Sequence, residues 1–156
     1  MFQEGTVEGV IFRSVRRHED LRGCLIELFR DDELPEEHRP TMSYVTLTLP
    51  GVARGPHEHQ QQSDLFLFVG PGDFKLYLWD SRRDSLSYKV RQVVMVGESN
   101  RQAVIIPPGV VHAYRNIGHV PGLVFNAPNR LYAGWGRSET VDEVRREEAD
   151  DPHVMD

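Results

Sequence analysis

The sequence predicts an all-β domain, a sandwich or barrel, over most of the chain from about residue 8 to about residue 126. Three observations favour this fold class. Short runs rich in Val, Ile, Leu, Phe and Tyr follow one another at even spacing. Turn-forming residues such as Pro-Gly and Gly-Pro-Gly separate the runs. Two runs alternate in side-chain character from one residue to the next, as the two faces of a strand do. Many short strands with such turns are typical of sandwiches and barrels.

The apolar runs give the expected strands, and each run ends at a turn sequence or a polar connection. In chain order these strands are residues 10–15, 24–30, 43–49, 54–59, 65–70, 73–80, 87–96, 102–106, 111–116 and 123–126. The clearest turns lie at residues 50–51, 70–72, 80–84, 97–100 and 107–109. The polar segment 31–39 is expected to connect two strands and to contain a short helical turn.

The two alternating runs indicate which side chains share a face. In residues 73–80, Phe74, Leu76 and Leu78 lie on one face, while the other face carries Tyr77 and Trp79. Because this second face is aromatic, we expect another sheet or a second subunit to cover it. In residues 43–49, apolar Val, Leu and Leu alternate with Tyr, Thr and Thr.

The pattern changes after about residue 138, where a charged stretch begins. Only Val141 and Val144 offer apolar anchors there. This segment is expected to form either a short helix capped by Ser138 or Thr140 or an irregular tail. We therefore expect one domain over residues 1–136 and a charged tail over residues 137–156.

Composition limits the function classes. The 156 residues suffice for one domain, and the net charge of −6 argues against a general nucleic-acid binder. A single cysteine, Cys24, excludes an internal disulfide, and we expect it to be a small buried side chain. No apolar run approaches the length of a membrane span, and the first ten residues lack the features of a signal peptide. A cytoplasmic location is the resulting expectation.

Three of the seven histidines stand in a pattern that indicates a shared site. His57 and His59 are two residues apart, so both rings point to one face of an extended chain. Asp64 follows near the start of the next apolar run, and His112 begins a strand after a Pro-Gly turn. Neutral imidazoles and a carboxylate are ligands for Mn, Fe, Co, Ni or Zn. The candidate metal ligands are therefore His57, His59, Asp64 and His112. The remaining histidines, His18, His38, His119 and His153, lie among polar or turn residues and are expected to be solvated.

The spacing of these residues resembles the two-part signature of the cupin superfamily. The first part runs from Gly51 through the H-x-H pair to an acid, and the second from Pro107 through His112 to Asn116. Three departures are visible. The usual acid is Glu rather than Asp64, and the spacing from this acid to the following Gly is one residue short. Arg101 stands where the second part usually opens with Gly. The resemblance implies a double-stranded β-helix, or jelly roll.

Four stretches, in order, also resemble a narrower cupin family, the dTDP-4-dehydrorhamnose 3,5-epimerases. They are DLRGCLIELF at 20–29, GVARGPH at 51–57, LYLWDSRRDSLSY at 76–88 and IIPPGVVHAYRN at 105–116. The resemblance implies a homodimer that acts on a nucleotide-linked 4-keto-sugar without an organic cofactor. Chemistry in that family begins when a His removes a proton next to the ketone.

The residues that match the family motifs acquire expected roles from the resemblance. His57 matches the catalytic base. Arg22 and Arg54 match arginines that hold the diphosphate, and Glu27 matches an acid that contacts the nucleotide. Tyr132 matches an aromatic residue near the nucleotide. Our candidate catalytic residues are His57 and His112, and the other four are candidate substrate-binding residues.

Two catalytic positions of the family do not carry over. The lysine that stabilises the enolate falls close to Asp64, where a carboxylate would repel the developing charge. The tyrosine that returns the proton falls on Phe125, which has no proton to give. Two polar positions that contact the nucleotide become Met42 and Tyr44.

Three hypotheses are consistent with these residues. The first is an epimerase or isomerase of nucleotide-linked keto-sugars, with His57 as base. The second is a metal-dependent cupin of another class, such as a dioxygenase or a small-sugar isomerase, in which a bound cation polarises a carbonyl. The third is a non-catalytic carbohydrate-binding cupin, which the missing Lys and Tyr favour.

Overall fold

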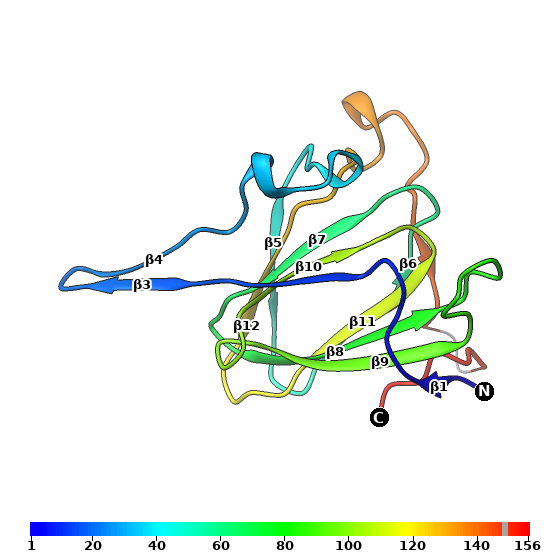
Figure 1. Cartoon of the computed structure of the whole chain (residues 1–156), viewed down its shortest axis with the longest axis horizontal. Helices are drawn as coiled ribbons and strands as arrows, with labels where there is room; N and C mark the ends of the chain where they lie inside the picture. The colour runs from blue at the N-terminus through cyan, green and yellow to red at the C-terminus, as the bar shows by residue number, and fades with distance from the viewer. Residues whose placement is uncertain (148–149) are drawn as a thin grey trace.

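The computed structural model describes residues 1–147 and 150–156 and shows a jelly roll made of two facing β-sheets (Figure 1). One sheet has the strand order β1-β9-β8-β11-β6-β13 and the other the order β2-β10-β7-β12-β5, while β3 and β4 form a separate hairpin. The strands are β1 Gln3–Glu4, β2 Ile11–Ser14, β3 Arg17–Asp20, β4 Gly23–Ile26, β5 Tyr44–Thr48, β6 Ala53–Glu58, β7 Asp64–Phe68, β8 Asp73–Asp80, β9 Val90–Gly97, β10 Gln102–Ile106, β11 Val110–Asn116, β12 Gly122–Asn126 and β13 Val144–Arg145. Short 3-10 turns lie at η1 Asp31–Glu33, η2 Glu36–His38 and η3 Trp135–Arg137.

The all-β jelly roll expected from the sequence is confirmed, and every expected strand has a counterpart. Strands β8 and β10 have the expected bounds. The charged tail adopts the irregular alternative in its described part, with the two-residue strand β13 paired to β6. Residues 148–149, which lie in the stretch expected as helix or tail, are outside the described residues. Within the described part of the chain no helix is long and apolar enough to cross a membrane.

The core lies between the two sheets and is rich in aromatic rings. Phe68 of β7 and Phe74 of β8 have ring centroids 5.7 Å apart, and Phe74 meets the Tyr114 ring of β11 edge-on at 5.6 Å. All three are almost fully buried. Burial of side chains of this size stabilises the fold by about 1.5–3 kcal/mol each. This core holds β7 against β11, and β6 pairs with β11 in the same sheet, so the three strands that carry the site are fixed relative to one another.

The aromatic face of β8 is covered by the two ends of the same chain. Tyr77 and Trp79 are buried against Phe2 and Met155, and the His153 ring meets Trp79 edge-on with centroids 5.7 Å apart. The expectation that another sheet or a subunit covers this face is therefore wrong. The expectation of a solvated His153 is also wrong, because this residue is only 6% exposed and contacts Ser81.

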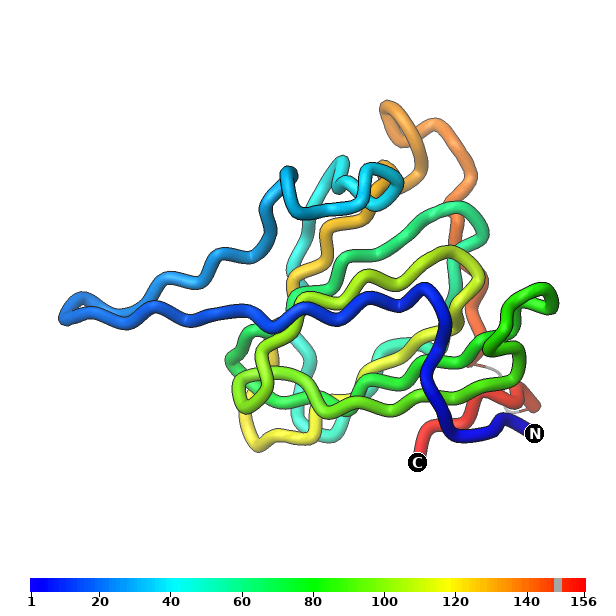
Figure 2. Tube along the Cα trace, in the orientation of Figure 1, coloured from blue at the N-terminus to red at the C-terminus, as the bar shows by residue number. Residues whose placement is uncertain are grey.

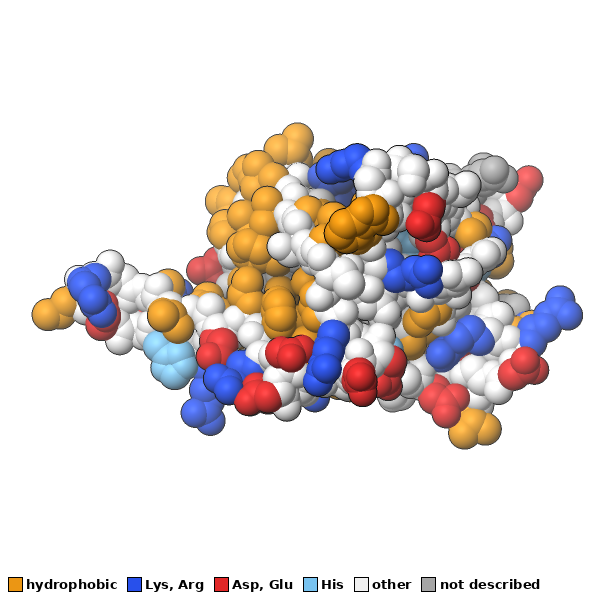
Figure 3. All heavy atoms as spheres, turned by 90° about the horizontal axis from the view of Figure 1, so that it is seen from above, with side chains coloured by type: hydrophobic (Ala, Val, Ile, Leu, Met, Phe, Trp, Pro, Cys, Tyr) orange, Lys and Arg blue, Asp and Glu red, His pale blue; other side chains and the backbone are white. Residues whose placement is uncertain are grey.

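Strand β5 reverses the usual orientation of an alternating strand. Its apolar residues Val45 and Leu47 point outward and are more than half exposed, as is the adjacent Leu49. Its polar partners Tyr44 and Thr46 point inward and line a cavity. Hydrophobic side chains gather on one side of the body in Figure 3. This chain thus leaves an apolar face uncovered while it places polar groups inside.

The β3–β4 hairpin projects from the body as a long arm, seen at the left of Figure 2. Its tip residue Leu21 is fully exposed, and Leu25 is 64% exposed. Cys24 also lies exposed on this arm, contrary to the expectation that it is buried. In a single chain these side chains of the arm therefore remain exposed to solvent.

Candidate functional site

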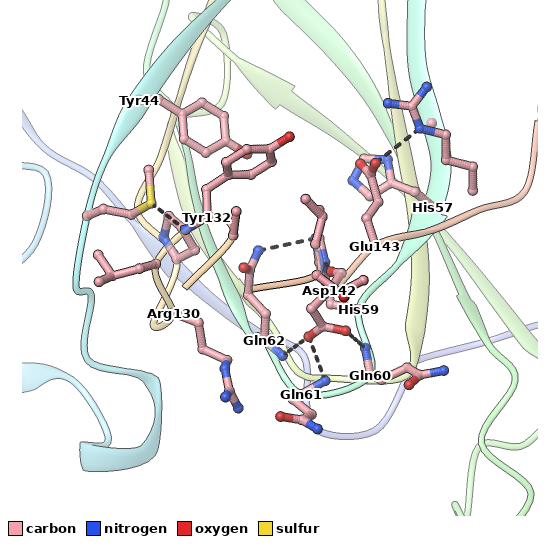
Figure 4. Close-up of a pocket in the computed structure, with 18 of the residues that line it drawn as sticks. Tyr44, His57, His59, Gln60, Gln61, Gln62, Arg130, Tyr132, Asp142 and Glu143 are labelled. Atoms are coloured by element: carbon pink, nitrogen blue, oxygen red, sulfur yellow. Dashed lines mark hydrogen bonds and ion pairs between the residues drawn. The ribbon is translucent and has the colours of Figure 1, made fainter. Parts of the chain in front are cut away.

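A cavity of about 1020 Å³ opens between the two sheets. The six-stranded sheet contributes His57 and Arg54 of β6, and the five-stranded sheet contributes Tyr44 and Thr46 of β5. Residues 128–134, which follow β12, and residues 139–145 of the tail complete the walls. Figure 4 shows side chains from these segments turned toward a common space. The volume suits a small-molecule ligand.

The three histidines of the sequence pattern lie together, with His57 and His59 on the cavity wall and His112 buried against them. His57 and His112 are directly opposite each other on the antiparallel pair β6 and β11, and their ring centroids are 4.4 Å apart. The His59 ring lies 5.6 Å from His57 and 5.9 Å from His112. One nitrogen from each ring lies within 4.8 Å of the others. The structure therefore brings together groups that are up to 55 residues apart in the chain.

Gly55 allows β6 to approach β11 this closely. Its φ of +83° is in the region that favours glycine. A Cβ atom at this position would lie 2.6 Å from the His112 carbonyl oxygen and 3.1 Å from His57 Nδ1. Any side chain there would therefore push the two catalytic candidates apart.

Asp64 forms the buried centre of a polar network behind the cavity wall. Its side chain is 1% exposed, and its Oδ2 lies 3.2 Å from His59 Nε2 and 3.4 Å from His112 Nε2. Its Oδ1 accepts hydrogen bonds of 3.0 Å from Gln62 Nε2 and Asn126 Nδ2. Burial alone raises the pKa of Asp64, but the two histidines outweigh it and hold the pKa below its ordinary value. Asp64 is therefore a carboxylate at neutral pH.

His59 carries the positive charge that balances Asp64. Its Nδ1 donates to the Asp142 carbonyl oxygen, and its Nε2 faces Asp64. Burial opposes the charge on His59, but the hydrogen bond and charge of Asp64, aided by Asp142, raise its pKa to about 9. The repulsion expected from a carboxylate at position 64 is thus offset by an adjacent imidazolium.

His57 has the opposite character and faces the cavity. Burial, reinforced by the nearby His112 and His59, lowers the pKa of His57 to about 3. Its ring therefore stays neutral at physiological pH. Among the described residues the His57 ring has no hydrogen-bond partner, so a nitrogen lone pair is free to accept a proton from a ligand in the cavity.

The tail closes the site from one side. The Asp142 carboxylate accepts three backbone N–H groups, from Gln60, Gln61 and Gln62, each at 2.9 Å. Strand β13 then pairs with β6, so that Arg145 lies opposite His57. The contacts of Asp142 fix both the loop after β6 and the His59 ring. The sequence offered no signal for this role, because Asp142 is one acid in a charged stretch.

Two candidate substrate-binding residues line the cavity and two do not. Arg54 donates from Nε to Thr48 Oγ1 and from a terminal nitrogen to the Leu47 carbonyl, both at 2.9 Å. Tyr132 lines the wall close to Tyr44 (Figure 4). Arg22 lies instead at the tip of the arm, where it pairs with Asp20. Glu27 lies near the base of the arm, beside a second, smaller cavity.

Strand β12 presents a different residue to the site than the family resemblance suggested. Phe125 points outward and packs against Leu65 and Leu67. The next residue, Asn126, points inward and donates hydrogen bonds to Asp64 at 3.0 Å and to the Tyr44 hydroxyl at 2.7 Å. Alternation along the strand thus excludes Phe125 from the site and includes Asn126.

The histidine pKa values predict a pH dependence of stability. The raised pKa of His59 means that its contribution is complete below about pH 6.5 and is lost as pH rises through about 9. The lowered pKa of His57 means that stability is lost as pH falls from about 6.5 toward 3. Urea unfolding from pH 4 to pH 10 is expected to show a loss of stability on both the acid and the alkaline side of neutral pH. In the variant His59→Gln the alkaline decline should shrink, and an unchanged decline would contradict the assignment of charge to His59.

Comparison with known proteins identifies relatives of the whole domain. A family model described as dTDP-4-dehydrorhamnose 3,5-epimerase matches residues 4–132. The chain is 35% identical over 127 residues to the probable low-salt glycan biosynthesis epimerase Agl13 of Haloferax volcanii, covering 81% of each chain. It is 37% identical over 115 residues to the spore coat polysaccharide biosynthesis protein SpsL of Bacillus subtilis, covering 74% of this chain and 75% of that one.

Solved structures share the fold. A dTDP sugar isomerase from Desulfovibrio desulfuricans superposes with a TM-score of 0.83 at 22% identity, covering 95% of this chain and 91% of that one. ChmJ from Streptomyces bikiniensis, a 3'-monoepimerase in complex with dTDP, has a TM-score of 0.78 at 20% identity, covering 99% of this chain and 77% of that one. At these identities the likeness shows the common jelly roll.

Proposed function

The chain belongs to the dTDP-4-dehydrorhamnose 3,5-epimerase family, and we propose that it inverts a carbon next to the ketone of a nucleotide-linked 4-keto-sugar. The observation that carries this proposal is the neutral His57 ring on the wall of a ligand-sized cavity. The relatives are named as epimerases or polysaccharide biosynthesis proteins, which favours an enzyme over a non-catalytic carbohydrate-binding cupin.

His57 removes the proton from the carbon next to the ketone, and the residues behind His57 hold its ring in place. The hydrogen next to a ketone is acidic because the carbanion is stabilised as an enolate. A neutral imidazole in the cavity accepts that proton, and the electron pair moves onto the ketone oxygen. His112 packs against the His57 ring and donates from Nδ1 to the Val110 carbonyl, 3.0 Å away, which fixes its orientation. We therefore assign His112 to positioning His57.

Arginines on the cavity wall suit the diphosphate of a nucleotide-sugar. Arg54, Arg130 and Arg137 line the cavity together with Arg145, which is paired with Glu143 at 3.0 Å. Guanidinium groups bind phosphate oxygens through two parallel hydrogen bonds. Arg54 is held in place by strand β5, and Tyr132 offers a ring against which the base can stack. We propose both as substrate contacts.

A homodimer accounts for the residues that do not reach the cavity of their own chain. The projecting arm carries Arg22 and Glu27, and the outer face of β5 exposes Val45 and Leu47. If two copies pair through these apolar surfaces, the outer face of β5 and the apolar side chains of the arm both become buried. The arm of one copy then lies near the jelly roll of the other. Sedimentation velocity tests this, because the wild type should be a dimer and Leu47→Glu should shift it toward monomer. A monomeric wild type removes the proposal.

The second candidate function is metal-dependent chemistry, with a divalent cation bound at the histidine cluster. One nitrogen each of His57, His59 and His112 lies within 4.8 Å of the others, and the buried Asp64 Oδ2 lies 3.4 Å from His112 Nε2. The other ring nitrogens of His59 and His112 contact carbonyl oxygens, as in protein metal sites. The donor set therefore fits a metal, which would polarise a carbonyl when bound. His57 cannot be ligand and base at once, so the two uses exclude each other. Elemental analysis decides, since metal far below one ion per chain leaves the metal-free proposal.

Incubation with dTDP-4-keto-6-deoxyglucose in heavy water tests the proposed function. Deuterium is expected at a carbon flanking the ketone, together with the epimeric sugar, both seen by proton NMR. The same assay with added chelator separates metal-free from metal-dependent activity. Absence of both exchange and nucleotide-sugar binding would remove the proposal. The cytoplasmic location and the division into residues 1–136 and a tail stay predictions.

A further inference from the structure

We propose that the Tyr44 hydroxyl is the acid that returns a proton to the sugar carbon on the face opposite His57. This assignment rests on the proposed function, because it supplies the second half of an inversion. Removal of a proton by His57 and its return from the same side restores the starting configuration. Inversion needs a second group with a transferable proton on the other side of the carbon, and Phe125 cannot provide one.

Tyr44 and His57 lie on opposite walls of one cavity. Tyr44 begins β5 in the five-stranded sheet, whereas His57 lies on β6 in the six-stranded sheet. Both line the cavity, and Figure 4 shows Tyr44 on one side and His57 on the other, with the Tyr132 ring beside Tyr44. A sugar ring between the sheets therefore presents one face to each residue.

The Tyr44 hydroxyl is held at the depth of the histidine cluster. Asn126 Nδ2 donates to it at 2.7 Å and donates to Asp64 Oδ1 at 3.0 Å. Asp64 Oδ2 in turn lies 3.4 Å from His112, whose ring packs against His57. The acid and the base are thus fixed to one buried network, so their separation is set by the protein.

The direction of the hydrogen bond leaves the phenolic proton available. Because the Asn126 amide donates, the Tyr44 oxygen accepts, and its own hydrogen is directed elsewhere. Burial, together with the nearby charge of Asp64, raises the pKa of Tyr44 above its ordinary value. The hydroxyl is therefore protonated at neutral pH, so it carries a proton when the enolate forms.

The other phenols at the cavity are less suited to this role. The Tyr114 hydroxyl is paired with Thr46 Oγ1 at 2.8 Å and its side chain is buried in the core. The Tyr132 hydroxyl has no hydrogen-bond partner among the described residues, whereas the Tyr44 hydroxyl accepts a hydrogen bond from Asn126. Tyr44 alone of these three is tied to the network that holds the base.

The proton balance of the step is complete. The carbon loses a proton to His57, and the electron pair forms the enolate. The enolate carbon then takes the proton of the Tyr44 hydroxyl on its other face, which restores the ketone and leaves a phenolate. Solvent takes the proton from the His57 imidazolium and returns one to the phenolate, so no co-reactant is consumed.

The variant Tyr44→Phe in heavy water separates the two halves of the reaction. We expect epimer formation to fall by about 100-fold or more, because one acid–base group contributes about 10²–10⁴ in rate. We expect deuterium to enter sugar of unchanged configuration at a rate within about tenfold of wild-type exchange, since His57 still removes and returns the proton. This retained exchange also shows that the variant is folded. Tyr88→Phe is the matched phenol deletion, because Tyr88 is exposed and does not line the cavity, and its ratio of inversion to exchange should stay that of the wild type.

Three other outcomes would each overturn the assignment of Tyr44 as the acid. Normal inversion in Tyr44→Phe overturns the assignment, and so does an equal loss of exchange and inversion. A loss of inversion in Tyr132→Phe with exchange retained transfers the role to Tyr132. If the wild type itself shows no exchange, the proposed function fails first, and the role of Tyr44 falls with it.

Discussion

Replacement of His57 by glutamine is expected to lower kcat/KM for epimerisation by about 1,000-fold, within the range of about 10²–10⁴ that general-base catalysis contributes. Glutamine has a similar size and keeps hydrogen-bonding capacity, but its amide does not accept a proton at neutral pH. The neutral His57 ring lies on the cavity wall, and its lowered pKa of about 3 keeps it unprotonated in the free protein. The loss should therefore appear in the chemical step.

Deuterium exchange distinguishes this loss from damage to binding or folding. In His57→Gln, exchange and epimerisation should fall together, because the proton is never removed. The dissociation constant for dTDP should change little. His119→Gln is the matched control, since His119 is an exposed turn residue away from the cavity, and it should keep full activity. Exchange that persists in His57→Gln would show that another residue is the base.

The histidine cluster was predictable because its signal is local. The H-x-H spacing places two rings on one face of a strand, and a Pro-Gly turn marks the start of the strand that carries His112. Antiparallel pairing then places His57 opposite His112. Strand β8 was also predictable from a local signal, because large apolar and aromatic side chains alternate along residues 73–80. The structure buries the side chains of both faces.

The partners of the cluster were not predictable from the sequence, because tertiary contacts define them. Asn126 reaches Asp64 only because β12 lies between β5 and β7 in the sheet. Asp142 reaches His59 because the tail returns along the edge of the jelly roll. The family resemblance places the catalytic tyrosine position at Phe125. A shift of one residue along a strand moves the side chain to the other face of the sheet, so the residue that points into the site is Asn126 instead.

Strand β5 shows why an alternating pattern alone does not reveal which face is inside. Its apolar face would normally be placed in the core. Here Tyr44 and Thr46 line a polar cavity, and Val45 and Leu47 are left outside. A strand that borders a ligand cavity has this reversed preference, and its exposed apolar face indicates a missing partner surface. The cavity therefore accounts for the orientation of β5.

The variant Asp64→Asn is expected to lower the free energy of unfolding by about 3 kcal/mol or more at neutral pH, because loss of one partner of a buried ion pair leaves the other charge uncompensated. An imidazolium at His59 would be buried without its carboxylate, 3.2 Å away in the wild type, so the variant must either bury this charge or release its proton. Asp64 accounts for most of the raised pKa of His59, so burial should return that pKa below its ordinary value. His59 is expected to become neutral in the variant.

The pH dependence of the same variant gives the sharper test. In the wild type the contribution of His59 to stability is lost as pH rises through about 9. Once the pKa of His59 is lowered, this alkaline decline should disappear, and stability should instead fall as pH drops below about 6.5. Asp20→Asn is the matched control, because it removes a carboxylate from an exposed ion pair with Arg22 and should leave the pH profile unchanged. Urea unfolding at pH 5, 7 and 9 measures all three proteins. If Asp64→Asn kept the alkaline decline, the raised pKa of His59 would not depend on Asp64, and the assignment of a buried Asp64–His59 ion pair would be wrong.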